Sequence, residues 1–519
     1  MKYLSRTRLY NFKRFREYEF QFHPKFNVLI GDNETGKSTV LLAIDLLLTA
    51  SRSRIESLGL ETLFNRTAIQ EFFTAGKQFK DLPILRAELY FNELDDPFFN
   101  GKNNTLDTEF DGIRLVCKPD DALGPEIRAV LDQAESNFPF EYYSYTFETF
   151  SGSYYSGTKK PLKWVNVDTS SNNGEYATRE YTRSMYETNL KGHEKAKHTN
   201  EYRKVKNAFN TEILRELNER TGDFTFGVKN SSRTNLESDL TVYESGISIE
   251  NKGKGKQCFI KASFALSKRG KGHDLVLIEE PENHLSHVNM NRLIDNIVEA
   301  SGKQVIVSTH NPLVASRLDL RNVFVLSKPA GRPATLSGVP EDVAKYFMKA
   351  PGSSLLEFIL SAKTILVEGA AEYILMEAFF LKETGKHTSE LGTQIISVNG
   401  TGFKNYIHIA KLIGSKVVVI RDNDGNYAEN ILENYKDLLG DTVGVFADED
   451  VARSTFEICV YDDNKGLCDD LFKAGRRTLS VQNYMLGNKT ESAFEILSKK
   501  YSEISVPKYI GAAFKWLNS

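Results

Sequence analysis

The chain has 519 residues, of which 40% are hydrophobic and 26% are charged, and its formal net charge is −3. This composition is near the globular average, which excludes a wholly disordered chain, a collagen-like repeat and a disulfide scaffold. The charge excludes a uniformly basic nucleic-acid coat but permits a local basic groove, since phosphate contacts need only a clustered patch. The length predicts about three domains.

Cysteine usage and hydropathy predict the compartment. The chain begins with a run of cations and has no apolar segment of the kind that a signal peptide requires. No stretch approaches the ~20 consecutive apolar residues of a membrane helix. We therefore expect a cytoplasmic protein with no membrane partner and with free thiols at its four separate cysteines, Cys117, Cys258, Cys459 and Cys468.

Segment 1–151 alternates strand-like and helix-like runs, which predicts an α/β layer. Its apolar runs have the lengths of buried strands, with one longer apolar run that has the length of a helix. Strands are expected at 18–22, 26–30, 84–91 and 113–117, and an apolar helix is expected at 38–48.

Segment 152–235 is polar and interrupts this pattern with clusters of Ser, Asn, Thr and Lys. Its strongest helix signal covers 193–220, where apolar residues recur at steps of three and four, namely Tyr202, Val205, Phe209, Ile213 and Leu217. Two interpretations remain open. Either the segment is an insertion whose helix faces a partner, with a role in dimerisation, or the helix packs on its own domain.

Strand and helix signals return in segment 236–345, which we expect to complete the first α/β region. A loop rich in Pro and Gly follows these signals at 328–340. A second α/β pattern begins near 362 and runs to about 461, and a mostly helical tail follows, which Pro507 interrupts. We assign residues 346–519 to this last domain.

Residues 31–38, GDNETGKS, fit the phosphate-loop pattern GxxxxGK[ST] and lie between an apolar strand-like run and an apolar helix. Glycines let such a loop curl so that backbone N–H groups face phosphate oxygens at a helix N-terminus. Lys37 can reach the β- and γ-phosphates of ATP, and the Ser38 hydroxyl can ligate Mg²⁺. The expected nucleotide contacts are Asn33, Gly36, Lys37, Ser38 and Thr39.

The strand-like run 274–278 is apolar after Asp274 and ends in the acidic pair Glu279 and Glu280. Such a strand end can hold water-coordinated Mg²⁺ through Glu279 and place Glu280 to polarise the attacking water. The alternative is a core strand that ends in a solvated acidic turn. A second apolar run, 304–307, ends in Ser-Thr-His and would place His310 at the γ-phosphate. His284 and His287 have the spacing of a metal pair, but no third ligand is evident nearby, so we do not expect zinc.

Together these motifs resemble those of an ABC/SMC-type ATPase head. The resemblance rests on the opening NFKRF, the early phosphate loop, the IEEPENHL strand end and the STH strand end. It implies that a signature loop, here 253–257 with Gly255, completes the nucleotide site of a second protomer. That loop departs from the usual Ser-Gly-Gly form, and Glu279 stands where many relatives have Asp, which implies slow ATP turnover. In such heads the N-terminal side can face DNA, which is one explanation of the cations in 2–16; scattered surface charge is the other.

Carboxylates also follow three short strand-like runs further along the chain. Run 364–367 ends at Glu368, with Glu372 four residues later; run 394–398 ends in Asn-Gly-Thr-Gly; and run 416–420 leads to Asp422 and Asp424. The ends of parallel strands line a common edge, so these carboxylates would converge there. Hard oxygen ligands suit Mg²⁺ or Mn²⁺, and two such ions stabilise the attacking and leaving oxygens of a phosphodiester displacement. The alternative is a pair of solvated acidic turns.

This block resembles a Toprim domain, and an ABC-type head followed by a Toprim domain is similar to the OLD (overcoming lysogenization defect) family of ATP-dependent nucleases. The predicted fold is therefore α/β, with a P-loop ATPase head, an inserted helical region and a Rossmann-like Toprim domain. The resemblance implies that Ser454–Glu457 is the SxxE element of the family, with Glu457 as a ligand of the second metal ion. It also implies that Lys489 stabilises charge on the phosphate, or that it is a solvated lysine at a helix start.

The resemblance implies an ATP-regulated, divalent-metal-dependent endonuclease that nicks or cleaves DNA. ATP would bind between the heads of a homodimer or higher homo-oligomer. It further implies a role in antiphage defence, in some systems with a defence partner or a retron nucleic acid. The rival interpretation is an ATP-gated DNA clamp or sensor whose Toprim module binds metal without cleavage. A Toprim primase or topoisomerase is disfavoured, because no tyrosine nucleophile domain or zinc module is apparent.

Overall fold

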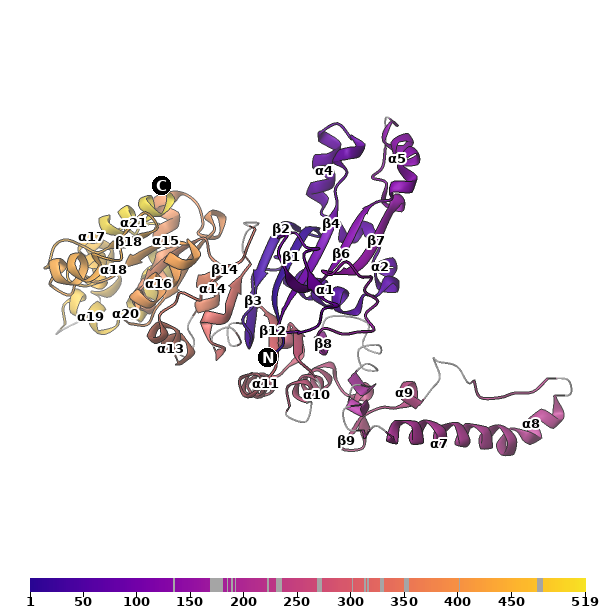
Figure 1. The fold of residues 1–519 in the computed structure, drawn as a ribbon. Coiled ribbons are helices and arrows are strands. Elements are labelled where there is room, and N and C mark those ends of the chain that lie inside the picture. Colours follow the sequence, from indigo (N-terminus) through magenta and orange to yellow (C-terminus); the bar gives the residue numbers. More distant parts are fainter. Residues whose placement is uncertain are drawn as a thin grey trace. The chain divides into compact units, whose positions relative to one another are not determined.

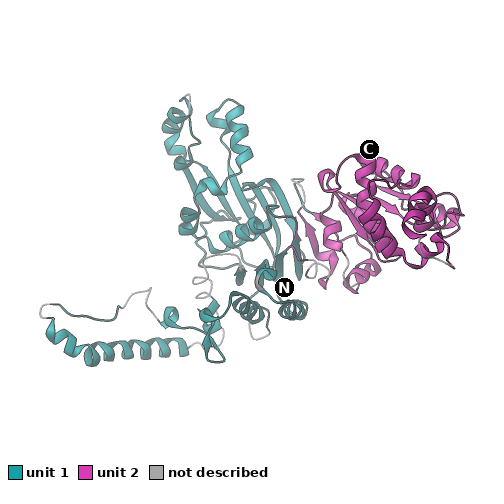
Figure 2. Ribbon diagram, turned by 180° about the vertical axis from the view of Figure 1, so that it is seen from behind, with its two compact units in different colours: residues 1–29, 33–309, 328–333 teal, residues 30–32, 310–327, 334–519 magenta. Residues whose placement is uncertain are grey.

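The computed structural model describes residues 1–133, 136–168, 181–183, 185–187, 190–191, 193–221, 224–229, 236–267, 273–300, 302–311, 314, 317–326, 331–349, 354–400, 402–473 and 479–519. They form two compact units, coloured separately in Figure 2. The first comprises residues 1–29, 33–309 and 328–333, and the second comprises 30–32, 310–327 and 334–519. None of the described helices is long and apolar enough to cross a membrane.

An antiparallel sheet forms one layer of the first unit (Figure 1). Its strand order is β2-β1-β4-β6-β5, with β7 also paired to β6. The strands are β1 (Tyr3–Phe12), β2 (Phe15–Gln21), β4 (Leu85–Asn92), β5 (Asn100–Gly101), β6 (Phe110–Pro119) and β7 (Tyr143–Thr149). Short helices accompany this layer, namely α2 (Arg52–Leu58), α3 (Leu60–Leu63), α4 (Arg66–Thr74) and α5 (Gly124–Leu131).

Strand β1 lies outside the elements expected from the sequence, because arginines obscure its alternation of buried and accessible residues. Leu4, Thr7 and Leu9 are buried. On the other face, Arg8 stands opposite Glu19 of β2, and its Nε lies 3.2 Å from Glu19 Oε2. Arg6 Nε lies 3.7 Å from Glu19 Oε1. Two cations of the N-terminal basic run therefore belong to cross-strand ion pairs.

The second layer of this unit is the sheet that carries the nucleotide motifs. The four of its six strands that belong to this unit follow the order β3 (Phe26–Ile30), β12 (Gln304–Thr309), β11 (Leu275–Glu279) and β8 (Trp164–Asp168), and β11 runs parallel to both of its neighbours. Every residue of β11 and β12 is buried, as expected for a parallel sheet that is covered on both faces. Strand β8 lies within segment 152–235, so the sheet extends into that polar segment. The helices α1 (Lys37–Thr49), α10 (Lys254–Leu266) and α11 (His287–Glu299) contact this layer or one another.

The helix expected at 193–220 is present as α7 (Glu194–Ala208), a π-helical turn (Phe209–Ile213) and α8 (Arg215–Arg220). None of the described residues in these three elements is buried. These three elements form a rod, and residues 224–229 return beside it (Figure 1). There the Asn218 side chain accepts from Phe226 N at 2.6 Å and the Asn210 side chain accepts from Val228 N at 2.7 Å. Nearby lie α9 (Leu236–Asp239) and the hairpin of β9 (Tyr243–Glu244) and β10 (Ile247–Ser248).

The second unit is built on a parallel sheet in the order β16-β15-β17-β18. These strands are β15 (Lys363–Val367), β16 (Thr393–Ser397), β17 (Lys416–Ile420) and β18 (Val443–Phe446). The unit also contains the β13 (Val323–Val325) and β14 (Ala334–Thr335) hairpin and the helices α13 (Glu341–Lys349), α14 (Leu355–Leu360), α15 (Ala370–Thr384), α16 (Phe403–Ile413), α17 (Phe456–Asp463), α18 (Lys465–Phe472), α19 (Val481–Gly487), α20 (Lys489–Lys500) and α21 (Lys508–Asn518).

Helices from both ends of this unit share its main core. Ile365 and Val367 of β15 and Val418 and Ile420 of β17 pack against apolar residues of α15, α17, α20 and α21. The tail is helical as expected, and Pro507 immediately precedes α21. This packing fixes the carboxyl ends of β15 and β17 relative to the first turns of α15, α17 and α20.

Candidate functional site

The phosphate loop connects β3 to α1, which begins at Lys37. Gly36 has a φ of 103°, and a Cβ added there would lie 2.5 Å from Phe15 Cζ and 2.7 Å from Arg14 Cδ. Both its backbone conformation and its surroundings therefore require glycine. Lys37 is buried, whereas Asn33 and Ser38 are exposed. The predicted contacts Asn33, Gly36, Lys37, Ser38 and Thr39 all lie in this loop and in the first turn of α1, and their binding of nucleotide remains a prediction.

The acidic end of β11 lies beside the end of β12. Glu279 pairs in register with Ser308, and Glu280 N donates to Ser308 O at 2.9 Å. The acidic turn is held by two side-chain contacts, which were not expected from the sequence. Thr309 Oγ1 donates to Glu282 Oε1 at 2.8 Å, and Asn283 Nδ2 donates to Glu280 Oε2 at 2.8 Å. This places Glu279 and Glu280 at one edge of the sheet with the Ser-Thr end of β12.

The positions of two further residues predicted for the nucleotide site, His310 and Gly255, do not test their predicted roles. His310 follows β12 but belongs to the second compact unit, whereas Lys37 belongs to the first. Gly255 lies in the first turn of α10, which opens after Gly253. The sequence-based roles of His310 at the γ-phosphate and of Gly255 in a second protomer's site therefore remain predictions.

The carboxylates of the second unit gather at the carboxyl edge of its parallel sheet. Strands β15 and β17 pair with Val367 opposite Ile420, so Glu368 and Arg421 leave the sheet side by side. Gly400 N donates to Glu368 O at 3.1 Å, which brings the turn after β16 to the same edge. Thr401 of that Asn-Gly-Thr-Gly turn lies outside the described residues.

Helix α17 brings Glu457 to the same edge. Phe456 N, in the first turn of α17, donates to Asp422 Oδ1 at 2.7 Å, so the next residue, Glu457, lies beside Asp422. Asp422, Glu372 and Glu457 are buried, while Asp424 is exposed. All five carboxylates expected from the sequence thus come close enough to influence the protonation of at least one other: Glu372, Glu368 and Glu457 act on Asp422, and Asp424 acts on Glu368.

Crowding of these carboxylates perturbs their titration. Burial raises the pKa of Asp422 to about 8, and the negative charges of Glu372, Glu368 and Glu457 add to the effect. Burial also raises the pKa of Glu368 and of Glu372, again with neighbouring carboxylates contributing. A cluster of buried acids that resist ionisation is stabilised by cations, as in a metal site or a functional site.

Two cations of the chain lie at this cluster. Lys489 Nζ, in the first turn of α20, lies 2.9 Å from Glu457 Oε2, and this ion pair raises the lysine pKa although burial opposes it. The buried guanidinium of Arg421 lies 3.0 Å from Asp424 Oδ2 and donates to Asp422 O at 3.1 Å. Sequence reasoning identified Lys489 but missed Arg421, which has no signal beyond its place beside the acidic motif.

The donor set fits a divalent cation. Apart from the ion pair with Lys489, the described residues donate no hydrogen bond to either oxygen of Glu457 or to Oε2 of Glu368, although all three atoms are buried. Such atoms retain the capacity to bind a hard cation. In the conformation described, no three His, Cys, Asp or Glu side chains of the described residues form a closed metal-binding group. The carboxylates therefore lie together without converging on one point.

Two family models match this chain. The model described as "AAA domain, putative AbiEii toxin, Type IV TA system" matches residues 26–316. The model described as "Overcoming lysogenization defect protein-like, TOPRIM domain" matches residues 359–424. No curated protein matches the chain.

Several solved structures match parts of this chain. The C-terminal region of the Burkholderia pseudomallei OLD protein is 19% identical, with 31% of this chain and 98% of that chain covered and a TM-score of 0.24. The corresponding region from Xanthomonas campestris pv. campestris is 18% identical, with coverages of 30% and 94% and a TM-score of 0.23. The SMC head domain from Thermotoga maritima is 14% identical, with coverages of 62% and 94% and a TM-score of 0.26.

The matched segments correspond to the two parts built above. The ATPase model spans the phosphate loop, β11 and β12, and the Toprim model spans β15, β16 and β17 up to Asp424. Since the first model covers more than half of the chain, the chain belongs to that AAA-domain family, and its residues 359–424 match an OLD-like Toprim domain.

Proposed function

We propose that this protein is an ATP-regulated, divalent-metal-dependent DNA endonuclease. The observation that carries the proposal is the cluster of buried carboxylates at the Toprim sheet edge, with Lys489 beside it. A solvated acidic turn would leave its carboxylates exposed and easily ionised. Here burial raises the pKa of Glu368, Glu372 and Asp422, which favours a site that takes up cations.

In this proposal the chain's own residues divide the work. The ligands of the divalent cations are Glu368, Glu372, Asp422, Asp424 and Glu457. When bound, Mg²⁺ or Mn²⁺ would stabilise the attacking and leaving oxygens of a phosphodiester displacement. Arg421 orients Asp424 through their ion pair. Lys489 stands where it can exchange its contact with Glu457 for one with a phosphate oxygen, and there it stabilises developing negative charge.

The ATPase head would regulate this site. Lys37 and Ser38 bind the phosphates of ATP and its Mg²⁺, Glu279 holds that ion through water, and Glu280 polarises the attacking water. Asn33, Gly36, Thr39 and His310 complete the contacts of one protomer, and Gly255 reaches the nucleotide of the other. The description of the matched ATPase family names a toxin, which agrees with a role in antiphage defence, alone or with a partner or retron nucleic acid.

We further propose that the rod formed by α7, the π turn and α8 pairs with the same rod of a second copy. Its apolar residues are exposed, with Val205 at 65%, Phe209 at 44%, Ile213 at 64% and Leu217 at 43%. Residues four apart drift by about 40° per step around an α-helix. The wider π turn at 209–213 counteracts this drift and keeps them on one face.

Charge complementarity favours a second copy in antiparallel orientation. Residues 194–206 carry five lysines and arginines against two glutamates, whereas 207–220 carry three glutamates against two arginines. An antiparallel pair centred on Thr211 places Val205 opposite Leu217 and Phe209 opposite Ile213. The same register places Arg203 opposite Glu219, so both the apolar and the charged positions match.

Cross-linking without nucleotide tests this pairing. In this pairing residue 211 lies opposite residue 211 of the second copy, so Thr211→Cys should form an intermolecular disulfide. All four native cysteines are buried and should contribute little background. Ile213→Asp should convert the dimer to a monomer by light scattering, whereas Val298→Asp, on an equally exposed residue of α11, should not. A dimer that survives Ile213→Asp, or a dimer without cross-linking at residue 211, would exclude this interface.

The nuclease itself is tested with purified protein, supercoiled and linear DNA, and Mg²⁺ or Mn²⁺, with and without ATP. We expect cleavage or nicking that Asp422→Ala abolishes and that Lys37→Ala uncouples from ATP. Cleavage that persists in Asp422→Ala would overturn the Toprim assignment. Bound metal without cleavage of any DNA form would instead favour an ATP-gated clamp or sensor.

A further inference from the structure

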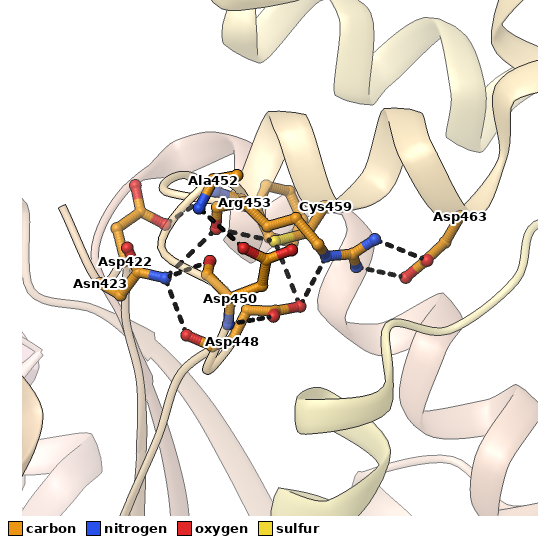
Figure 3. A network of polar contacts seen from close by, with 9 residues as sticks. Asp422, Asn423, Asp448, Asp450, Ala452, Arg453, Cys459 and Asp463 are labelled. Carbon is orange, nitrogen blue, oxygen red and sulfur yellow. Dashed lines mark hydrogen bonds and ion pairs between the residues drawn. The ribbon is translucent and has the colours of Figure 1, made fainter. Parts of the chain in front are cut away.

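The middle residue of the Asp422-Asn423-Asp424 turn joins the strand end to the loop that follows β18. Asn423 is 1% exposed, and its Nδ2 donates to three backbone carbonyls, those of Asp448 (2.8 Å), Asp450 (3.0 Å) and Arg453 (3.4 Å) (Figure 3). Its Oδ1 accepts from Gly425 N at 2.8 Å. A side-chain amide has two N–H donors and one carbonyl, so Asn423 uses both of its N–H donors on this loop.

Arg453 fixes the far end of the same loop to helix α17. Its Nε donates to Asp448 Oδ2 at 2.8 Å, and its two terminal nitrogens donate to the two carboxylate oxygens of Asp463 at 2.9 and 2.8 Å. Figure 3 shows the guanidinium between these two aspartates. A bidentate pair of this kind fixes direction as well as distance, so the loop and α17 behave as one body.

The loop in turn sets where Glu457 lies. Asp424 N donates to Ser454 O at 3.1 Å, and Phe456 N donates to Asp422 Oδ1 at 2.7 Å. The Glu457 carboxylate has its ion pair with Lys489 and, among the described residues, no further hydrogen bond. Its position relative to Asp422 is therefore determined by the backbone of the loop rather than by contacts of its own side chain.

We propose that Asn423 and Arg453 are positioning residues that keep Glu457 beside Asp422, so that both carboxylates can close on a divalent cation. The proposal rests on the proposed function, because the cation is the one that the nuclease would use. Neither residue touches that cation. Each acts through the loop at 448–455, and the outer partners of metal ligands commonly change metal affinity by about 10- to 100-fold when they are lost.

The substitution Asn423→Asp separates positioning from charge. It keeps an oxygen for Gly425 N but replaces the N–H donors with an oxygen that faces three carbonyls. The added negative charge alone would tighten cation binding, so weaker binding can come only from lost positioning. Asn426→Asp is the matched control, because it adds the same charge three residues away, where the side chain is exposed and bonds only to Glu429 among the described residues.

Mn²⁺ binding without nucleotide, followed by electron paramagnetic resonance, is the primary measurement and does not depend on cleavage. We expect Asn423→Asp to weaken Mn²⁺ binding by about tenfold or more, with Asn426→Asp unchanged. In cleavage assays the Mg²⁺ concentration at half-maximal rate should rise similarly, while the rate at saturating Mg²⁺ is largely retained. A purely structural role would lower that rate as well.

Arg453→Lys guards against a variant that fails to fold. It retains the charge but loses the bidentate contact, so we expect a smaller loss of Mn²⁺ affinity in the same direction. Unchanged Mn²⁺ affinity in folded Asn423→Asp or in Arg453→Lys, or an equal loss in Asn426→Asp, would overturn the proposal. If the wild-type protein binds Mn²⁺ with this dependence but cleaves no DNA, the nuclease proposal fails and the positioning role stands.

Discussion

At the phosphate loop, consecutive residues supply the groups that would meet the nucleotide, and Gly36 lets the backbone turn into α1. At the Toprim edge, the carboxylates come from the ends of β15 and β17 and from the first turns of α15 and α17. The first arrangement is local and relies on backbone N–H groups. The second requires a folded sheet and several packed helices before its charges meet. The two sites should therefore respond differently to substitution.

The largest expected effects are losses of function at one site that leave ligand binding at the other site intact. Lys37→Ala removes the ammonium that would contact the phosphates, and we expect ATP affinity or turnover to fall by about 100-fold or more. Asp422→Asn should lower cleavage by a similar factor. Each variant should leave the other site's ligand binding intact, measured as fluorescent-nucleotide binding and as Mn²⁺ binding without nucleotide. Mutual loss of both ligands would show that the sites are not independent.

A split between metal affinity and rate is expected at Lys489. The lysine forms an ion pair with Glu457, so Lys489→Met frees that carboxylate for a cation while removing a charge that would face the phosphate. We expect Mn²⁺ to bind more tightly and cleavage to fall by about 10- to 100-fold. Lys499→Met, on the solvent-exposed end of the same helix, is the control. Weaker Mn²⁺ binding in Lys489→Met would contradict the competition between the lysine and the metal.

A smaller effect is expected when alanine replaces the glycine of the phosphate loop, because the backbone is strained and the space is filled there. Gly36→Ala combines a φ of 103° with a clash against Phe15, and we expect about 2–3 kcal/mol lower free energy of unfolding. Gly385→Ala has a φ of 71° in the same left-handed region but open space around its Cβ, so we expect about 1 kcal/mol. Urea unfolding measures both. Equal losses would mean that Phe15 and Arg14 move aside without cost.

These expectations also show what could be read from the sequence. The phosphate loop was predictable because its motif is contiguous and its strand and helix are adjacent. The gathering of Glu368 and Asp422 was predictable because parallel strands end at one edge. The roles of Asn423 and Arg453 were not predictable, since they depend on contacts between residues that are more than twenty positions apart in the chain. An asparagine between two aspartates resembles an ordinary turn until its tertiary contacts are known.

Two of the strands that were not expected from the sequence, β1 and β8, were missed for a related reason. In β1, Arg6 and Arg8 occupy accessible positions that local pattern reasoning associates with charged surface, and only pairing with Glu19 explains them. Strand β8 lies in a polar segment and gains its place from pairing with β11. In both cases the strand can be recognised only from the neighbouring strand that pairs with it, and the local sequence pattern does not show that pairing.

A graded pH dependence is expected at the Toprim edge. Burial raises the pKa of Asp422 to about 8, with Glu372, Glu368 and Glu457 contributing, against about 4 for an unfolded aspartate. Between these values the metal-free native state holds a proton that the unfolded state has lost, so the free energy of unfolding falls as pH rises from about 4 to 8.

Cation binding must displace that proton, so Mn²⁺ affinity should rise with pH by up to about tenfold per unit over the same window and level off above about 8. The carboxylates titrate together, which spreads the transition over this range. Asp422→Asn should flatten both slopes, whereas Asp441→Asn, on an exposed aspartate of the same unit, should change neither. An ATP affinity that follows the same slope would contradict the distinction between the two sites, because the phosphate loop presents backbone N–H groups to the nucleotide, and these do not titrate.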